Sequence, residues 1–254
     1  MHGHGERCTG HRTRRGRTRL ARNGLGSGDY DRSAGFSIGR PRIAALRQTH
    51  PDLQIDLTVG VRSLDIARRE SDLAIRFARP AASELVCRKL GEVGFSLYAS
   101  QRYLAKSGIP KRGQGLGGYD LIAFTRAPAA TSPFFMGESL DGARVAVRCD
   151  NPLIQLKAAA NEAGIAELAC FLGDSSPDLV RIWPDEPPAR RTAWLVIHQD
   201  MRRSARIRVV SASIGEAFRR QRKTLEQGSR DRSGPFDTAK AAAATSQDAR
   251  VSNS

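Results

Sequence analysis

Strand-like and helix-like segments alternate from Pro41 to about residue 223, and this alternation constrains the fold more than any other feature of the sequence. Residues 54–60, QIDLTVG, place apolar side chains at every second position, as a half-buried strand does. Asn151 is suited to cap a helix that continues, with apolar residues at helical spacing, to about residue 163. A chain that alternates strands with helices in this way is predicted to fold as an α/β protein.

The same patterns place the other elements. Further strands are expected at 72–77, 85–90, 95–99, 121–125, 144–148 and 194–198, and further helices at 41–49, 62–70, 100–107 and 204–222. Gly91 and Gly94 are expected to separate two of these strands, and Gly164 is expected just after the end of the helix that begins at Asn151. The glycine-rich residues 108–118 predict a crossing between two lobes.

Both ends of the chain lack a periodic apolar pattern. Residues 1–40 carry nine arginines and three acidic residues, and the whole chain has a net charge of +15. Such segments bury too little apolar surface to offset the entropy lost on ordering. We therefore expect 1–40 and 224–254 to be disordered and 41–223 to be the folded domain.

Cysteine usage and hydropathy suggest where the chain works. Cys8, Cys87, Cys149 and Cys170 lie far apart and form no C-x-x-C pair, so free thiols are expected. No apolar run reaches the roughly 18 residues of a membrane span, and the first residues show no export signal. These features predict a cytoplasmic protein without a membrane partner.

No motif indicates catalysis, a cofactor or a metal. His198 and Asp200 would need Ser100 or Ser204 to complete a nucleophilic set, and no G-x-S-x-G turn is present. The potential metal ligands near the start, His2, His4, Cys8 and His11, lie in an arginine-rich setting that opposes a cation. The sequence therefore predicts a protein that is not an enzyme, with no cofactor and no metal.

Four stretches of residues 41–222 form a recognisable set. They are LRQTHPDLQI (46–55), ESDLAIR (70–76), the segment 90–110 with its LG, YAS, YL and GIP pieces, and the segment 163–198 with AGIA, CFLGD, LVR and WLVIH. In this order and at this spacing, they resemble the effector-binding domain of LysR-type transcriptional regulators and span most of the predicted folded domain.

The resemblance implies a fold and a site. The fold would be type-2 periplasmic-binding-protein-like, with lobe I at about 41–100 plus 196–222, lobe II at about 101–195, and a cleft for a small-molecule effector. Arg62 or Arg76 suits a carboxylate effector, although Arg76 has the alternative role of an exposed or inter-lobe ion pair. The implied effector-binding residues are Gly60, Val61, Arg62, Ser63, Arg76, Ser100, Asn151, Pro152, Leu153 and Gly164.

Some residues depart from the family pattern. The first 40 residues show no winged helix-turn-helix, and 24–37 lack the expected first strand, so lobe I is expected to expose a sheet edge. Glu167 stands where the family has an apolar residue and would need a partner if buried. Our hypothesis is a truncated or frame-disrupted regulator that forms a homo-oligomer. DNA is expected as a partner only because the family resemblance implies it, or through non-specific binding. The alternatives are a solute-binding protein of the same fold and a non-specific nucleic-acid binder acting through the arginine-rich head.

Overall fold

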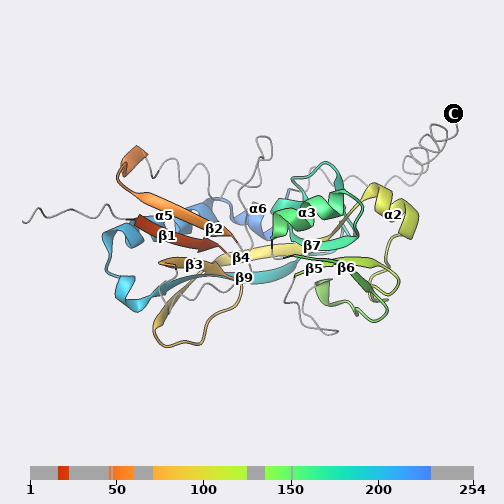
Figure 1. Cartoon of the computed structure of the whole chain (residues 1–254), viewed down its shortest axis with the longest axis horizontal. Coiled ribbons are helices and arrows are strands. Elements are labelled where there is room, and N and C mark those ends of the chain that lie inside the picture. The colour runs from red at the N-terminus through yellow and green to blue at the C-terminus, as the bar shows by residue number, and fades with distance from the viewer. Residues whose placement is uncertain are drawn as a thin grey trace, which may run out of the picture.

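Two long antiparallel strands run through the middle of the molecule in the computed structural model (Figure 1). The structure describes residues 17–22, 46, 48–59, 71–124, 135–149 and 151–229. Strand β4 (Leu85–Ser100) pairs with β9 (Ala189–His198) from Leu85↔His198 to Phe95↔Ala189. These two strands connect a first lobe around β1, β2, β3 and α5 with a second lobe around β5, β6, β7 and α3.

The remaining strands complete one mixed sheet in the order β2-β1-β3-β9-β4-β7-β5-β6, with β8 paired to β4. The strands in each lobe are parallel: β1 to β2 and β3 in the first, and β5 to β6 and β7 in the second. Parallel strands with helices between them confirm the predicted α/β fold. The remaining bounds are β1 Arg17–Arg22, β2 Gln54–Val59, β3 Leu73–Arg76, β5 Asp120–Ala123, β6 Arg144–Arg148, β7 Ile165–Ala169 and β8 Leu179–Arg181.

The structure places one strand, β1, within 1–40, the segment that we expected to be disordered. Strand β1 lies between β2 and β3, with Leu20 in register with both Leu57 and Leu73. Its sequence, RTRLAR, contains no β-branched apolar residue, but backbone pairing on both sides outweighs this weak propensity. The first lobe therefore has the central strand that we expected to be missing.

The crossing between the lobes is also different from the predicted one. Residues 85–100 form one continuous strand, because β9 and then β7 and β8 pair with it beyond Gly91 and Gly94. The glycine-rich segment 108–118 stays inside the second lobe, where Leu116 N–H donates to Ser139 O at 2.8 Å. The crossing is made by β4 and β9 instead.

Side-chain caps begin two of the described helices, α2 at Ser100 and α3 at Asn151. The described helices are α2 (Gln101–Ser107), α3 (Pro152–Ala160), α4 (Cys170–Gly173), α5 (Ala205–Arg220) and α6 (Arg222–Gln227), with short 3₁₀ turns at Phe135–Gly137 and Gln199–Met201. Leu46, Gln48 and Thr49 are helical as predicted, whereas the helix predicted at 62–70 lies outside the described residues. Helix α6 extends past residue 224, where we expected the disordered tail to begin, and its Leu225 is 1% exposed and packs in the core.

Glu162, rather than Gly164, occupies the left-handed position after α3. Its φ is +66°, and the N–H groups of Glu162 and Ala163 donate to the carbonyls of Ala159 and Ala158 at 3.2 and 3.0 Å. Gly164 instead begins the connection to β7, where a side chain would collide with the carbonyl of Asp120.

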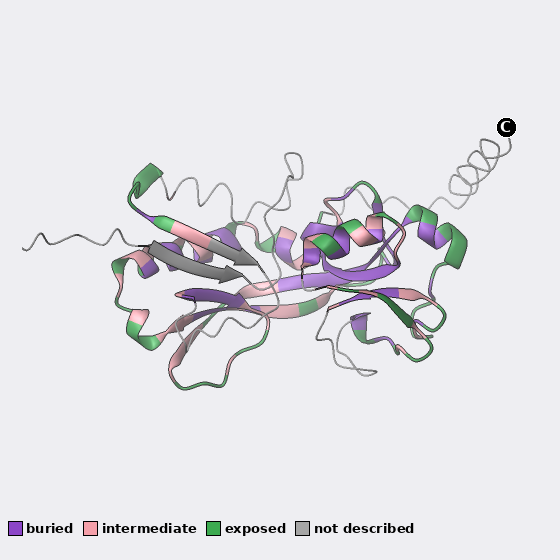
Figure 2. Ribbon diagram, in the orientation of Figure 1, coloured by how far each residue is buried: buried purple, intermediate pink, exposed green. Residues whose placement is uncertain are grey.

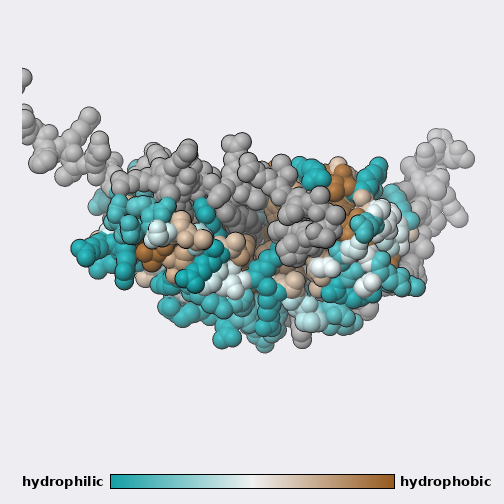
Figure 3. Space-filling view, turned by 90° about the horizontal axis from the view of Figure 1, so that it is seen from below, coloured by the Kyte–Doolittle hydropathy of each residue, from teal (hydrophilic) through white to brown (hydrophobic). Residues whose placement is uncertain are grey.

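The core is nearly continuous across the two lobes (Figure 2). One cluster joins Leu73 and Ile75 of β3, Ile207 and Val210 of α5, and Leu156 of α3. A second cluster packs α2 and the 135–137 turn on the other side of the second lobe's strands. Hydrophilic side chains dominate the face seen from below, with smaller apolar patches (Figure 3).

Candidate ligand-binding site

Strand direction decides which predicted site residues lie at the crossing. Arg76 ends β3 in register with Trp194, at the end of β3 nearer the middle of β9. Residues Asn151, Pro152 and Leu153 begin α3 just after the carboxyl end of β6, which runs parallel to β5 and β7. In β7 the carboxyl end, Ala169, is the end that pairs with Phe95 near the crossing. Arg76 and the start of α3 therefore approach the crossing from opposite lobes.

Two other predicted residues lie at the opposite end of the second lobe. Ser100 pairs with Leu179 at the carboxyl end of β4, and its Oγ already accepts from Tyr103 N–H at 3.2 Å to cap α2. Gly164 precedes the amino end of β7 and lies against Asp120. The structure therefore separates Ser100 and Gly164 from Arg76. Gly60, Val61, Arg62 and Ser63 lie outside the described residues.

A chain of contacts joins the lobes at the crossing. Phe77, which follows β3, meets Phe95 of β4 edge to face, with ring centroids 5.2 Å apart. The guanidinium carbon of Arg191, on β9, lies 4.2 Å from the centroid of the Phe95 ring. Glu167, on β7, is ion-paired with Arg191 at 2.5 Å and accepts from Met136 N–H at 3.0 Å. We call Phe77, Phe95, Met136, Glu167 and Arg191 the inter-lobe cluster.

Glu167 has the partner that its burial requires. Its side chain is 2% exposed, and a carboxylate at this depth is costly to bury unless it is paired and hydrogen-bonded. Arg191 neutralises the charge, and Met136 supplies a further N–H donor. This pair explains how an acidic residue occupies a position where the resemblance implied an apolar one.

The start of α3 offers polar groups on the second lobe's side. Asn151 Oδ1 accepts from Leu153 N–H at 2.9 Å, and Pro152 fills the first helical position. Gln155, one turn further, is 1% exposed, and its Oε1 has no hydrogen-bond donor among the described residues. Buried polar atoms are normally satisfied, so this amide is a candidate for contact with a ligand or a water molecule. Apolar spacing gave no signal for Gln155, because a polar residue on the buried face breaks the pattern.

A second buried ion pair, Arg181–Asp174, binds residues 227 and 229, near the end of the described chain, to the second lobe. Arg181 Nη2 lies 2.7 Å from Asp174 Oδ2, and the Tyr98 hydroxyl donates to Asp174 Oδ1 at 2.7 Å. Arg181 also donates to the carbonyl of Gln227, and Ser229 N–H donates to Asp174. Burial raises the pKa of the Asp174 carboxyl and raises that of the Cys170 thiol to about 11. Since α5 packs in the first lobe, the α5–α6 segment is a further connection between the lobes.

No helix in the described part of the chain has the length and apolar character needed to cross a membrane. The same residues contain no group of three or more side chains that could ligate a metal ion. The histidines and the cysteine near the start, which we considered as ligands, lie outside them.

Two parallel half-sheets joined by two crossing strands, with the end of β3 and the start of α3 on the crossing side of their lobes, define a bilobal domain of the type-2 periplasmic-binding-protein-like class. Solved structures agree. The regulatory domain of CrgA, a LysR-type regulator from Neisseria meningitidis, superposes with a TM-score of 0.61 at 19% identity, covering 79% of this chain and 98% of that one. The effector domain of AmpR from Pseudomonas aeruginosa gives 0.60 at 19% identity, covering 83% and 100%.

The sequence profile of the LysR substrate binding domain matches residues 31–219, and the chain belongs to this family. An HTH-type transcriptional regulator of Xanthomonas campestris is 29% identical over 122 residues, which cover 48% of this chain and 36% of the relative. DmlR of Escherichia coli is 34% identical over 80 residues, which cover 30% and 26%. The chain thus matches about a third of the length of these curated relatives.

Proposed function

We propose that this chain is the effector-sensing part of a LysR-type transcriptional regulator and works in the cytoplasm without catalysing a reaction. A small molecule would bind at the crossing, between the end of β3 and the start of α3, and its binding would favour one arrangement of the lobes over another. The observation that supports this most is the position of Arg76 at the end of β3 and of Asn151–Leu153 at the start of α3, on the crossing side of opposite lobes. The family match favours a regulator over the solute-binding alternative.

A small carboxylate is the class of effector that we propose. The planar guanidinium of Arg76 matches a carboxylate, and the amino end of α3 favours negative charge. The unsatisfied Oε1 of Gln155 is an acceptor, so a hydroxyl group on the carboxylate ligand would supply the donor that it lacks. Control of DNA binding is proposed as an activity of the whole regulator, in keeping with relatives named as HTH-type regulators.

A thermal-shift experiment tests this proposal. The full chain is heated with a panel of small aliphatic, hydroxy and aromatic carboxylates, and a ligand at about 100 times its Kd should stabilise it by about 2.7 kcal/mol. Gln155→Leu and Arg76→Ala should each reduce the shift, whereas Lys111→Ala, an exposed change in the second lobe, should not. Equal shifts in all four proteins, or no shift with any carboxylate, would count against the proposal.

We also propose that the chain forms a homo-oligomer through the outer side of the second lobe. Strand β6 is the terminal strand of the sheet, with Val145 36% exposed, and Ile154 of α3 is 54% exposed. Strand β6 pairs with β5 on one side only, and its outer edge, which has no neighbour among the described strands, suits contact with a second copy beside exposed apolar side chains. Ile154→Glu should shift the sedimentation of the full chain toward the monomer. Unchanged sedimentation would place the interface elsewhere.

A further inference from the structure

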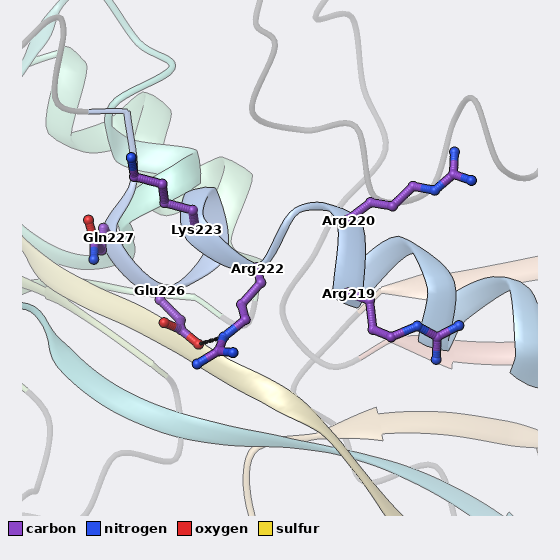
Figure 4. Close-up of a pocket in the computed structure, with 6 residues that line it drawn as sticks. All are labelled: Arg219, Arg220, Arg222, Lys223, Glu226 and Gln227. Carbon is purple, nitrogen blue, oxygen red and sulfur yellow. Dashed lines mark hydrogen bonds and ion pairs between the residues drawn. The ribbon is translucent and has the colours of Figure 1, made fainter.

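A pocket with a strongly basic lining lies where α5 ends and α6 begins, away from the crossing residues discussed above. Its volume is about 330 Å³. Gln221 lies between α5 and α6, so residues from the end of one helix and from the next helix line this pocket (Figure 4). The lining residues are Arg219, Arg220, Arg222, Lys223, Glu226 and Gln227.

The positive charge of this pocket is only partly neutralised. Arg219 and Arg220 share one carboxylate, Glu216, at 2.5 and 2.6 Å, and Arg222 pairs with Glu226 at 2.8 Å. Lys223 is exposed and has no acidic partner among the described residues.

The surrounding segment extends this basic surface. Residues 199–229 contain eight Lys and Arg against three Asp and Glu. Arg202, Arg203 and Arg208, near the start of α5, are also exposed. The α5–α6 surface, defined as the exposed side chains of 202–223, therefore carries a single sign of net charge.

Helix stability does not account for all four basic residues. Arg219 and Arg220 are in the last turn of α5, where cations stabilise a helix by interaction with its dipole. Arg222 and Lys223 are in the first turn of α6, where the same interaction is unfavourable for a cation.

The directions of the side chains fit an extended anion better than a compact one. In Figure 4, Arg220 and Lys223 point to one side of the helices, whereas Arg219 and Arg222 point to the other. They do not converge on one point as they would around a single small anion. Arginine forks match phosphate oxygens, and a phosphate backbone offers many of them in a row.

The apolar content of this surface argues against a protein or membrane partner. The large apolar residues exposed in the described chain are Ile109, Val145 and Ile154, and none of them is in α5 or α6. Protein interfaces have an apolar core, and helices that lie on membranes present large apolar side chains to the lipid. We propose that the α5–α6 surface binds the phosphate backbone of double-stranded DNA without reading its sequence, so that the effector domain itself holds DNA.

Salt dependence of DNA binding tests this proposal. Fluorescence anisotropy of a labelled duplex of arbitrary sequence is measured with the full chain between about 50 and 200 mM salt. The double variant Arg220→Ala/Lys223→Ala should bind more weakly, and the slope of log K against log salt should fall by about 1.8, since each lost phosphate contact removes about 0.9. Both substitutions affect exposed side chains, and circular dichroism would verify the fold.

A matched control distinguishes the contribution of this surface to DNA binding from the effect of the total charge of the chain. Arg102→Ala/Lys111→Ala removes the same charge from exposed positions near α2, and the arginine-rich head is unchanged in both variants. The proposal predicts a wild-type slope for this control. Equal losses in the two double variants, or no binding of the duplex by the wild-type chain at low salt, would overturn it. Neither result bears on carboxylate binding, which the thermal-shift experiment reports separately.

Discussion

Arg191 reaches Glu167 at 2.5 Å and thereby joins β9, a crossing strand, to β7 in the second lobe across the intervening β4. The same guanidinium lies 4.2 Å from the centroid of the Phe95 ring, which contacts Phe77 beyond the end of β3. The crossing is thus held by one charged pair and one aromatic pair. A ligand placed beside them would contact groups that belong to both lobes.

Removing one partner of this pair should be costly. Arg191→Met leaves the Glu167 carboxylate buried without its counter-charge, and we expect the free energy of unfolding in urea to fall by about 3 kcal/mol. The double variant Arg191→Met/Glu167→Leu should recover most of the loss, because no buried charge remains. Arg190→Met, at the exposed neighbouring position, is the control and should change little. A single variant as stable as that control would show that the pair is not needed.

Asp174 should control whether α6 stays docked. Asp174→Ala removes the acceptor of Arg181, Tyr98 and Ser229 N–H, which leaves the buried guanidinium of Arg181 without a counter-charge. We expect a loss of about 3 kcal/mol and faster cleavage of α6 in limited proteolysis followed by mass spectrometry. Asp178→Ala, an exposed change nearby, should leave the cleavage rate unchanged. Equal rates for the two variants would contradict the role assigned to Asp174.

Glu138 should make stability depend on pH. Burial raises its pKa, but N–H donation from Gly113 and Gly115 and the charge of Arg112 lower it by more, so the pKa lies below its ordinary value of 4.5. A carboxyl of this kind stabilises the fold above its unfolded-state pKa, and the contribution is lost as pH falls through the lower folded-state pKa. The difference in Tm between wild type and Glu138→Gln should therefore be largest near neutral pH and shrink below pH 4.5. A difference that does not vary with pH would refute this.

Cys170 should resist thiol reagents while the chain is folded. Burial raises its pKa to about 11, so almost none of it is the reactive thiolate at neutral pH. Cys87 and Cys149 are only partly buried and should be alkylated first by iodoacetamide in native conditions. Peptide mass spectrometry would show Cys170 modified only after unfolding in urea. Modification of Cys170 at the rate of Cys149 would contradict this burial.

The local sequence pattern was sufficient to predict several helices and strands. Alternating apolar residues predicted β2 and β6, and the capping residue Asn151 predicted the start of α3. Strand β7, IAELA, was missed because all five residues are buried and a charged residue interrupts the apolar run. Strand β1 was missed because its order comes from pairing with β2 and β3, which are distant in sequence.

The site was predictable only in part, for a geometric reason. Every strand end looks similar in sequence, but only the carboxyl ends of the parallel strands meet the crossing. Arg76 and Asn151 follow that rule, whereas Ser100 ends a strand that runs the other way. Sequence spacing could not predict the Arg191–Glu167 pair. The two side chains come together only because β9 and β7 lie on either side of β4 in the folded sheet.

Hydrogen–deuterium exchange of the full chain, with and without the carboxylate that gives the largest thermal shift, tests the central claim most directly. If the effector binds at the crossing, protection should increase together in residues 73–77 of the first lobe and 149–156 of the second. Protection confined to one of these segments, or centred on residues 100–107 at the far end of the second lobe, would contradict the account.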